Sequence, residues 1–272
     1  MKLATLRIDG TTAAVRVDDT SATLIDGYPD LSALLAAPDW ESLAQNASGP
    51  TVSLDGADYA PVVPRPGKIV CVGLNYATHI KEMGRDLPEY PTLFAKFADA
   101  LTGPYDDVVV PEYAAAQLDW EAELAFVIGK PAYQVSEADA DGYIAGYSVI
   151  NDYTMRDYQY RTPQWDQGKN FEKTSGFGPV LVTDYTLGSP IETRLDGELM
   201  QSASTDDLVF SPAKLVEYIS HIVTLNPGDV VITGTTGGVG HARKPARHIG
   251  DGQTVEVSIE GLGTVRNTTI VK

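Results

Sequence analysis

Short segments with the composition of β-strands follow one another through most of this 272-residue chain, and regular helices do not separate them. A helix longer than a few turns is predicted only at 212–224, where Ser211-Pro212 supplies an N-cap and a first-turn proline. Because doubly wound sheets and (β/α)₈ barrels need helices between successive strands, we predict a mostly β fold with some α. The expected strands are 68–73, 92–97, 107–110, 119–128, 146–153, 179–183, 191–195, 198–203, 229–233, 254–260 and 264–271.

The first sixty residues have a pattern of their own. Residues 2–8 and 13–17 alternate around Asp9-Gly10, which predicts a hairpin, and residues 30–46 carry short helical patterns around Pro38. Three prolines and a glycine within residues 60–67 predict an extended linker. We therefore expect a small N-terminal α/β domain over 1–64 and a larger, strand-rich domain over 65–272.

Charge and cysteine content exclude several classes of function. With 37 acidic and 20 basic side chains, the formal net charge is −17, and a protein of this sign repels nucleic acid and anionic membrane surfaces. We find no apolar run of about 18 residues that would span a membrane. The single cysteine, Cys71, lies in an apolar run and cannot form an internal disulfide, which favours a reducing, cytoplasmic location.

Acidic side chains follow one face of the strand expected at 119–128. Side chains two residues apart share a face, so Asp119, Glu121 and Glu123 point together. They indicate either a site for a hard divalent cation or an acidic strand end in water. A fourth acid, Asp152, ends the apolar strand Val149-Ile150-Asn151, where it either joins the same site or caps a helix over 154–160.

Two further segments carry residues suited to catalysis. Residues 75–84 predict a short helix that begins at the N-cap Asn75, and His79 and Glu82 are adjacent on its surface. This pair is either a general base that activates water or an ordinary surface pair. Lys169, which follows a glycine, either stabilises a developing enolate or lies on the surface.

The apolar strand 229–233 runs into a glycine-rich loop over 234–240. Its backbone amides either bind an oxyanion or form a tight structural turn. The loop lacks the sequence order of phosphate and dinucleotide sites, and a basic cluster follows it at 241–248. Because no nucleophilic serine or cysteine motif and no zinc-protease helix is present, a hydrolase of this sequence would use metal-assisted attack by water.

Taken together, these segments resemble the fumarylacetoacetate hydrolase superfamily from about residue 68 to residue 272. The resemblance rests on Gly73-Leu74-Asn75-Tyr76 with His79 and Glu82, Asp119 to Glu123, Asn151-Asp152 with Arg156, Asp157 and Gln159, Gly168-Lys169 with Phe171, Pro227-Gly228-Asp229 to Gly240, and Glu260 to Gly263. It implies a β-roll-like C-terminal domain, a small N-terminal domain and a homodimer. Asn170 and Thr236 depart from the residues common in the family, which leaves the substrate open.

The resemblance also implies roles for individual residues. Glu121, Glu123 and Asp152 match ligands of Mg²⁺ or Mn²⁺, whereas Asp119 matches an acidic neighbour that is not a ligand. The pair formed by His79 and Glu82 matches a water-activating dyad on a mobile lid, and Lys169 matches the lysine that stabilises an enolate. The matching substrate contacts are Arg156, Gln159 and Thr235, with Gly234 beside them.

These roles predict a metal-dependent hydrolase that cleaves a carbon–carbon bond in a small anionic β-diketo or acylpyruvate-type acid. In this reaction the histidine dyad deprotonates water, and Lys169 stabilises the enolate that leaves. The same site also suits a decarboxylase, isomerase or hydratase of an oxaloacetate-like 2-oxo acid. A catalytically silent, metal-stabilised binding module is the alternative outside enzymology.

Overall fold

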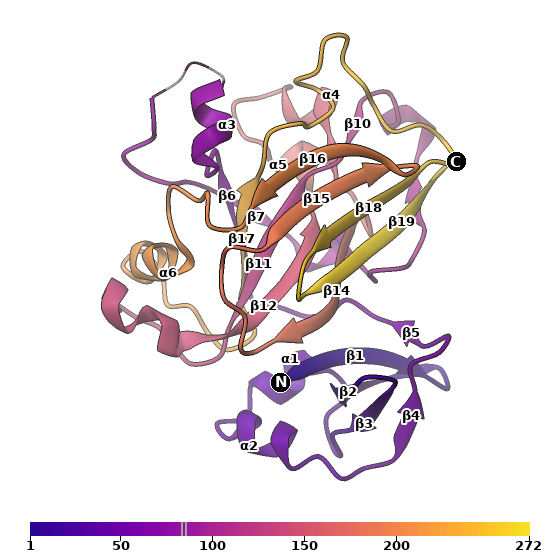
Figure 1. Cartoon of the computed structure of the whole chain (residues 1–272), viewed down its shortest axis with the longest axis vertical. Helices are drawn as coiled ribbons and strands as arrows, with labels where there is room; N and C mark the ends of the chain where they lie inside the picture. Colours follow the sequence, from indigo (N-terminus) through magenta and orange to yellow (C-terminus); the bar gives the residue numbers. More distant parts are fainter. Residues whose placement is uncertain (83, 85) are drawn as a thin grey trace.

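The computed structural model of the protein describes residues 1–82, 84 and 86–272. Within these residues it contains a twelve-stranded sheet, a five-stranded sheet and a two-stranded sheet (Figure 1). The helices between and around the sheets are short. The prediction of a mostly β fold with some α is therefore confirmed.

The large sheet forms the centre of the molecule. Its path is β4 (Thr51–Ser53), β3 (Ser21–Leu24), β2 (Thr11–Val17), β1 (Lys2–Ile8), β14 (Ser175–Val182), β12 (Ile144–Asn151), β11 (Ala122–Ile128), β17 (Val230–Thr235), β6 (Ile69–Gly73) and β7 (Thr92–Lys96). Beside this path, β5 (Asp58–Tyr59) pairs with β1, and β8 (Leu101–Thr102) pairs with β14. Neighbouring strands run antiparallel except for β17 with β6 and β14 with β8, which are parallel.

The smaller sheets lie against the large one. The five-stranded sheet has the order β16 (Glu198–Ser204), β15 (Pro190–Leu195), β18 (Thr254–Ile259), β19 (Gly263–Val271) and β9 (Val108–Val110). The two-stranded sheet joins β10 (Leu118–Asp119) to β13 (Thr154–Met155). Between the layers, β11 is buried along its whole length. Leu124 packs in the cluster shared with the five-stranded sheet, whereas Ala125 and Val127 face the opposite layer.

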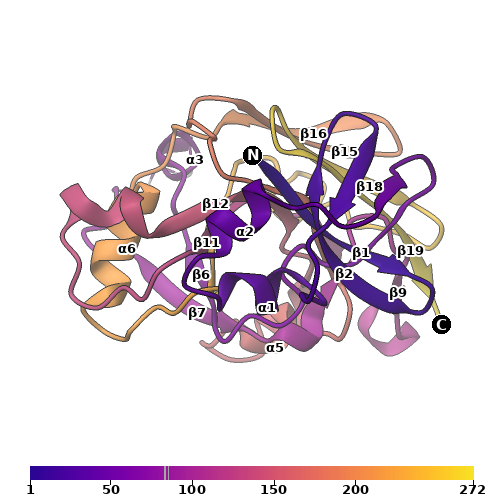
Figure 2. The same ribbon diagram turned by 90° about the horizontal axis from the view of Figure 1, so that it is seen from below.

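That opposite layer is formed by the N-terminal helices α1 (Leu31–Leu35) and α2 (Trp40–Gln45). Seen from below, both helices lie across the face of the central sheet (Figure 2). Leu31, Leu34 and Trp40 are buried there, and Trp40 Nε1 donates to the Gly129 carbonyl (3.3 Å). Burial of these side chains joins the N-terminal segment to the larger body.

The first strand extends this connection. Lys2 and Leu3 of β1 pair with Val182 and Leu181 of β14, so the N-terminal strands belong to the central sheet. The division of the chain at residue 64 stays a prediction. No described helix is long and apolar enough to cross a membrane, and the cytoplasmic location also stays a prediction.

The remaining helices lie at both ends of the central sheet, with α6 packed against the Ile128 end of β11. They are α3 (Ala77–Glu82), α4 (Arg156–Gln159), α5 (Asp166–Lys169) and α6 (Pro212–Ser220), with 3₁₀ turns at Ala98–Ala100, Glu112–Ala114 and Glu137–Tyr143. The prediction that α6 continues to residue 224 is wrong. The carbonyl of Ser220 accepts from Gln134 N (3.0 Å), and its hydroxyl accepts from Val135 N (3.1 Å). The carbonyl is therefore engaged outside the helix and does not accept the next helical hydrogen bond.

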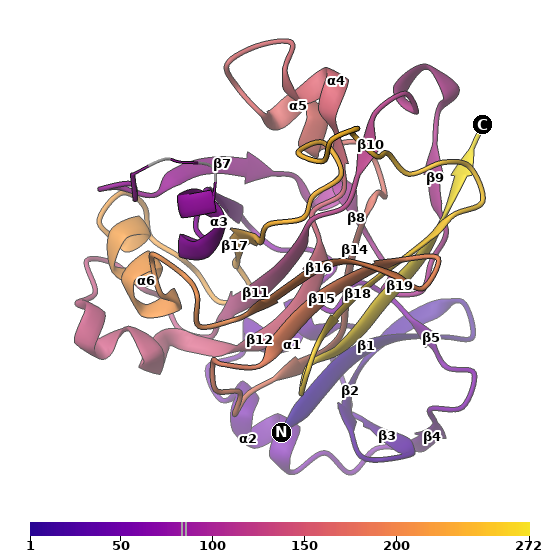
Figure 3. The same cartoon turned by 45° about the horizontal axis from the view of Figure 1, so that its top comes forward.

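The expected continuous strand at 119–128 is also interrupted. β10 ends at Asp119 and β11 begins at Ala122, because Glu121 N donates to the side chain of Asn151 (3.0 Å) instead of a strand carbonyl. Asp152 N in turn donates to the Glu121 carbonyl (2.9 Å). These bonds place the acids of β11 beside the end of β12. At the same end, α4, α5 and the loop after β17 gather (Figure 3).

Candidate active site

Three of the predicted acids meet at this end of the central sheet. Each of Glu121, Glu123 and Asp152 offers one carboxylate oxygen, and these oxygens lie within 4.8 Å of one another. The residues are 6%, 2% and 0% exposed, so the alternative of an acidic strand end in water is wrong. Asp152 caps no helix, because α4 begins at Arg156 with Met155 as its N-cap residue. The geometry leaves a site in which the three carboxylates act together.

Two buried lysines neutralise part of this charge. Lys169 Nζ lies 2.6 Å from Glu121 Oε2 and 2.7 Å from Asp152 Oδ2. Lys96 Nζ lies 2.9 Å from Asp152 Oδ1, and it also donates to the carbonyl of Lys169. The alternative of a surface position for Lys169 is wrong, since the residue is 2% exposed at the end of α5.

Arg156 forms the next layer of the site. Its Nε donates to Asp119 Oδ2 (2.8 Å), and its Nη1 lies 2.7 Å from Glu121 Oε1 and 2.9 Å from Gln159 Oε1. Its Nη2 is buried and has no hydrogen-bond partner among the described residues. Arg156 therefore keeps one donor free beside the acidic cluster, while Asp119 is occupied by the arginine.

The balance of charges differs from one acid to the next. Burial raises the pKa of Glu123 well above its usual range, and the nearby charges of Asp152 and Glu121 raise it further. Burial also opposes ionisation of Asp152, but Lys169 and Lys96 outweigh it and lower the pKa of that carboxyl. For Lys169, burial disfavours the ammonium, yet Asp152 and Glu121 raise its pKa overall. Glu123 is thus the carboxylate whose charge the protein compensates least.

The uncompensated negative charge of Glu123 tests whether these residues fit a metal. A hard divalent cation such as Mg²⁺ or Mn²⁺ prefers oxygen ligands, and three buried carboxylates supply them. Bound there, the cation would remove the like-charge repulsion that raises the pKa of Glu123. The donor set therefore fits the expected metal, while the choice between Mg²⁺ and Mn²⁺ stays a prediction.

The end of β17 and the glycine-rich loop after it donate backbone amides to the protein's own acids. Gly234 N donates to Glu123 Oε2 (2.5 Å), and the N–H groups of Gly240 and His241 donate to the two oxygens of Asp119 (2.7 and 2.9 Å). Gly234 has φ +99°, and a Cβ there would lie 2.8 Å from the Val72 carbonyl. The Gly234 amide therefore binds a carboxylate of the site, and the contact of Gly234 with substrate stays a prediction.

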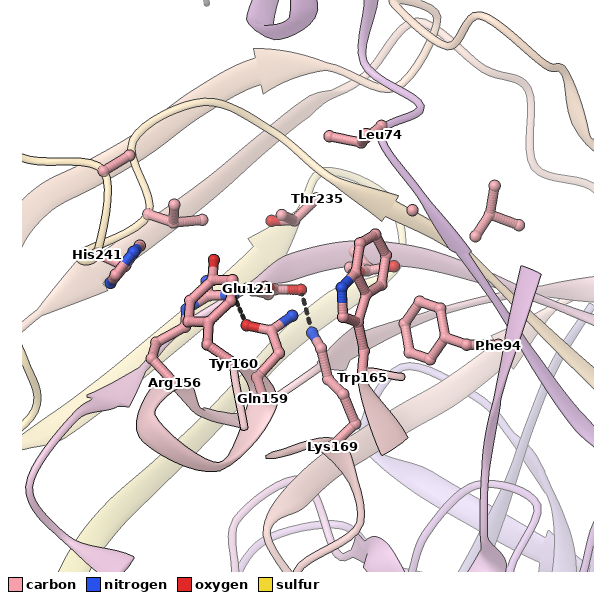
Figure 4. Close-up of a pocket in the computed structure, with 15 residues that line it drawn as sticks. Leu74, Phe94, Glu121, Arg156, Gln159, Tyr160, Trp165, Lys169, Thr235 and His241 are labelled. Carbon is pink, nitrogen blue, oxygen red and sulfur yellow. Dashed lines mark hydrogen bonds and ion pairs between the residues drawn. The ribbon is translucent and has the colours of Figure 1, made fainter. Parts of the chain in front are cut away.

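A cavity of about 290 Å³ opens onto these groups. Its floor includes Glu121, Glu123 and Lys169. Trp165 and Phe94 form one side, with ring centroids 5.3 Å apart in an edge-to-face arrangement, and Tyr160 and His241 form the other (Figure 4). The predicted contacts Arg156, Gln159 and Thr235 also line it, so the structure brings them together with Lys169.

The helix with the predicted dyad, α3, begins three residues after Leu74, which lines this cavity. The side chains of His79 and Glu82 lie outside the described residues, so their pairing stays a prediction, although both belong to α3. The prediction that Asn75 caps this helix is wrong. Its side chain instead binds the carbonyls of Phe210 (3.1 Å) and Thr233 (2.8 Å), while Asp207 accepts from Thr78 N (3.0 Å).

Sequence reasoning missed several residues of the site. Lys96 lay at the end of a predicted strand, two residues after Phe94, and that spacing places both side chains on one face. No local pattern marked Tyr160, and His241 was marked only as the first residue of the basic cluster at 241–248. They come from segments about 80 residues apart, and only the tertiary fold brings their rings to 5.0 Å.

Comparison with known proteins agrees with this architecture. The model of the fumarylacetoacetate (FAA) hydrolase C-terminal family matches residues 68–270, and the chain belongs to this family. The resemblance inferred from the motifs is confirmed. The matched members with named activities are enzymes, and the chain is an enzyme of the same family.

Three relatives illustrate the range of named activities. The chain is 39% identical over 226 residues to the protein named oxaloacetate tautomerase Fahd2a, mitochondrial, of Rattus norvegicus, with 81% of this chain and 72% of that protein aligned. It superposes with TM-score 0.89 and 32% identity on the fumarylacetoacetate hydrolase of Exiguobacterium antarcticum, with complete coverage of both chains. The 5-carboxymethyl-2-hydroxymuconate delta-isomerase of Mycobacterium smegmatis gives TM-score 0.84 and 30% identity, again over both whole chains.

Proposed function

We propose that this enzyme interconverts the keto and enol forms of a small 2-oxo acid, with oxaloacetate as the first candidate. In this reaction a proton leaves the carbon beside the 2-oxo group and a proton is added to the oxo oxygen, so that no other atom is gained or lost. The name of the rat relative, an oxaloacetate tautomerase, supports this choice. The isomerase name of the Mycobacterium smegmatis protein supports a reaction without net hydrolysis.

The observation that carries the proposal is the buried ammonium of Lys169 at the floor of the cavity. Asp152 and Glu121 outweigh the effect of burial and raise its pKa, so the group is protonated at neutral pH. A fixed positive charge at this place stabilises negative charge that develops on an enolate oxygen. Because the ammonium is already held by two carboxylates, little reorganisation accompanies the reaction.

Other side chains of this cavity would bind the acid. Arg156 has the buried donor Nη2, and Gln159 and Thr235 line the same space. A divalent cation held by Glu121, Glu123 and Asp152 would supply Lewis-acid polarisation of the oxo group. The group that accepts the proton belongs, by resemblance, to the predicted pair of His79 and Glu82 on α3.

A cavity of about 290 Å³ also favours a compact substrate. Ligand sites for drug-sized molecules occupy roughly 300–1,000 Å³, so this volume is at the lower limit of that range. The edge-to-face pair of Trp165 and Phe94 closes the apolar side. A four-carbon oxo acid suits this space better than an acid with a long acyl chain.

Hydrolysis of an acylpyruvate stays the second candidate. It is favoured by the name of the Exiguobacterium antarcticum structure, which matches the whole chain. This reaction requires an attacking water, and the predicted dyad on α3 would activate it. Decarboxylation of oxaloacetate requires no water and would release pyruvate.

The experiment measures the decay of freshly dissolved enol-oxaloacetate by its ultraviolet absorbance, with Mg²⁺ or Mn²⁺ present. We expect a rate well above the buffer rate and a loss of about 10²–10³-fold in kcat for Lys169→Met. Lys173→Met is the matched control, since the Lys173 side chain is 73% exposed. Release of pyruvate from oxaloacetate would indicate decarboxylation. Cleavage of an added acylpyruvate would indicate hydrolysis. An unchanged rate in Lys169→Met would contradict the proposal.

A further inference from the structure

Tyr160 and His241 form a polar edge of the cavity for which the proposed reaction has no use. Their ring centroids are 5.0 Å apart and their planes are inclined by 35°. Both residues are exposed, Tyr160 to 58%, so their polar groups are accessible from the cavity mouth. Figure 4 shows the pair on the side of the cavity opposite Trp165 and Phe94.

Backbone contacts hold both residues in place relative to Arg156. Tyr160 N donates to the carbonyl of Arg156 (3.1 Å), and His241 N donates to Asp119 Oδ2 (2.9 Å). The same Asp119 oxygen accepts from Arg156 Nε (2.8 Å). The backbone of His241 is therefore held beside Arg156, and its imidazole ring lies against the ring of Tyr160.

The buried cations beside the floor of the cavity are already paired with the protein's own acids. These cations, Lys96, Lys169 and Arg156, face four buried carboxylates, those of Asp119, Glu121, Glu123 and Asp152. The opposite wall, formed by Trp165 and Phe94, offers mainly apolar surface. Because Arg156 Nη2, Gln159 and Thr235 are assigned to the 2-oxo acid end of the substrate, Tyr160 and His241 are the residues that would donate to a distant carboxylate at this edge.

We propose that His241 and Tyr160 form a subsite for the far carboxylate of a compact 2-oxo dicarboxylic acid. The imidazole N–H and the phenol O–H each donate one hydrogen bond to it, and hydrogen bonds to a carboxylate are stronger than neutral ones. The inference rests on the proposed function, since it assigns the 2-oxo end of the same acid to the floor of the cavity. It makes the enzyme selective for diacids over monoacids.

The test compares oxaloacetate with its 4-methyl ester, which keeps the 2-oxo acid end but has no far charge. We expect His241→Phe, which keeps the ring but removes its N–H, to raise KM for oxaloacetate about tenfold. Its kcat should stay within about twofold, and the constants for the ester should not change. Tyr160→Phe should act in the same direction with a smaller effect. His221→Phe is the matched control, because His221 is exposed and binds the carbonyl of Glu217 on α6.

Two outcomes would overturn the subsite: an equal loss for both compounds in His241→Phe, or a wild-type enzyme that does not prefer the diacid. Calorimetric binding of the same two compounds to the metal-loaded protein separates this inference from the proposed reaction. If the wild type binds but does not convert oxaloacetate, the proposed function fails. In that case the subsite is still supported if His241→Phe weakens the binding of oxaloacetate but not of its 4-methyl ester. It is overturned if the variant weakens the binding of both compounds or of neither.

Discussion

Lys96 and Asp152 form an ion pair of 2.9 Å in which neither side chain is exposed to solvent. Lys96 ends β7 and Asp152 follows β12, so the pair joins two strands that are not neighbours in the central sheet. Lys96 also donates to the carbonyl of Lys169 at the end of α5. One ammonium thus fixes a candidate metal ligand and the candidate enolate-stabilising residue relative to each other.

Removing this ammonium should be costly. We expect Lys96→Met to lower the free energy of unfolding by about 3–5 kcal/mol, because it leaves an uncompensated carboxylate in the interior. Urea unfolding at neutral pH measures the change. Lys130→Met, at an exposed lysine just after β11, is the control and should alter stability by less than about 0.5 kcal/mol. A loss below about 1 kcal/mol for Lys96→Met would show that the pair is dispensable.

The effect of Glu123 on stability should depend on whether a metal is bound. In metal-free buffer, Glu123→Gln should be as stable as the wild type or more so, since it removes a charge repelled by Asp152 and Glu121. Saturating Mn²⁺ should stabilise the wild type by about 2.7 kcal/mol at one hundred times Kd, and the variant by much less. Thermal unfolding with Mn²⁺ and with a chelator makes the comparison. Equal metal-induced shifts in both proteins would exclude Glu123 as a ligand.

The pH dependence of stability should report on Asp106, which binds Arg7 of β1 through both carboxylate oxygens (2.9 and 2.7 Å). Burial opposes ionisation of Asp106, but the hydrogen bonds from Arg7, the Gly103 amide and Thr102 outweigh it and lower the pKa. A lowered pKa contributes stability that is complete above the unfolded value of about 3.9 and is lost as the pH falls through the folded value.

Asp106→Asn should therefore be less stable than the wild type by roughly 1.5–3 kcal/mol at pH 7, the range for hydrogen bonds to a charged group. The difference between the two proteins should shrink as the solution is acidified below about pH 4. Urea unfolding across this pH range measures it. A difference that stays constant with pH would mean that the ionised carboxylate is not what joins β1 to the body.

Gly73 allows Trp165 to close the apolar side of the cavity. A Cβ at this position would overlap the indole ring, so Gly73→Ala must displace Trp165. We expect kcat/KM for the substrate to fall about tenfold in Gly73→Ala, with a smaller additional loss when it is combined with Trp165→Leu. A double-mutant cycle over these variants measures the coupling, and additive effects would show that the two residues act independently.

The strand pattern was predictable because side-chain alternation is local. β6, β15, β18 and β19 lie within about one residue of their expected bounds, and the hairpin of β1 and β2 forms around Asp9-Gly10. The start of α6 at Ser211-Pro212 was predictable as well, but its end at Ser220 and the break before Ala122 were not. They depend on side chains such as Asn151 and on carbonyls such as that of Ser220, which act across the fold rather than along the sequence.

The candidate site also has features that the sequence could predict and features that it could not. The meeting of Glu121, Glu123 and Asp152 was predictable as one alternative, because acids at the ends of apolar strands indicate a site, whereas only the family resemblance placed Lys169 beside them. The contribution of Lys96 and the pairing of Tyr160 with His241 were not, because charge compensation and ring contacts depend on tertiary packing. The side chains of the α3 dyad lie outside the described residues, so that prediction is carried forward unchanged.

Backbone amides at the end of β17 and in the loop after it bind Glu123 and Asp119, and this has an evolutionary consequence. Every residue except proline has an N–H, so the side chains of Val239 and His241, which line the cavity, are free to vary without loss of these bonds. A change in loop length would move the donors themselves. Single substitutions in a loop of fixed length can therefore change the lining of the cavity, while the bonds to the buried acids of the candidate site stay in place.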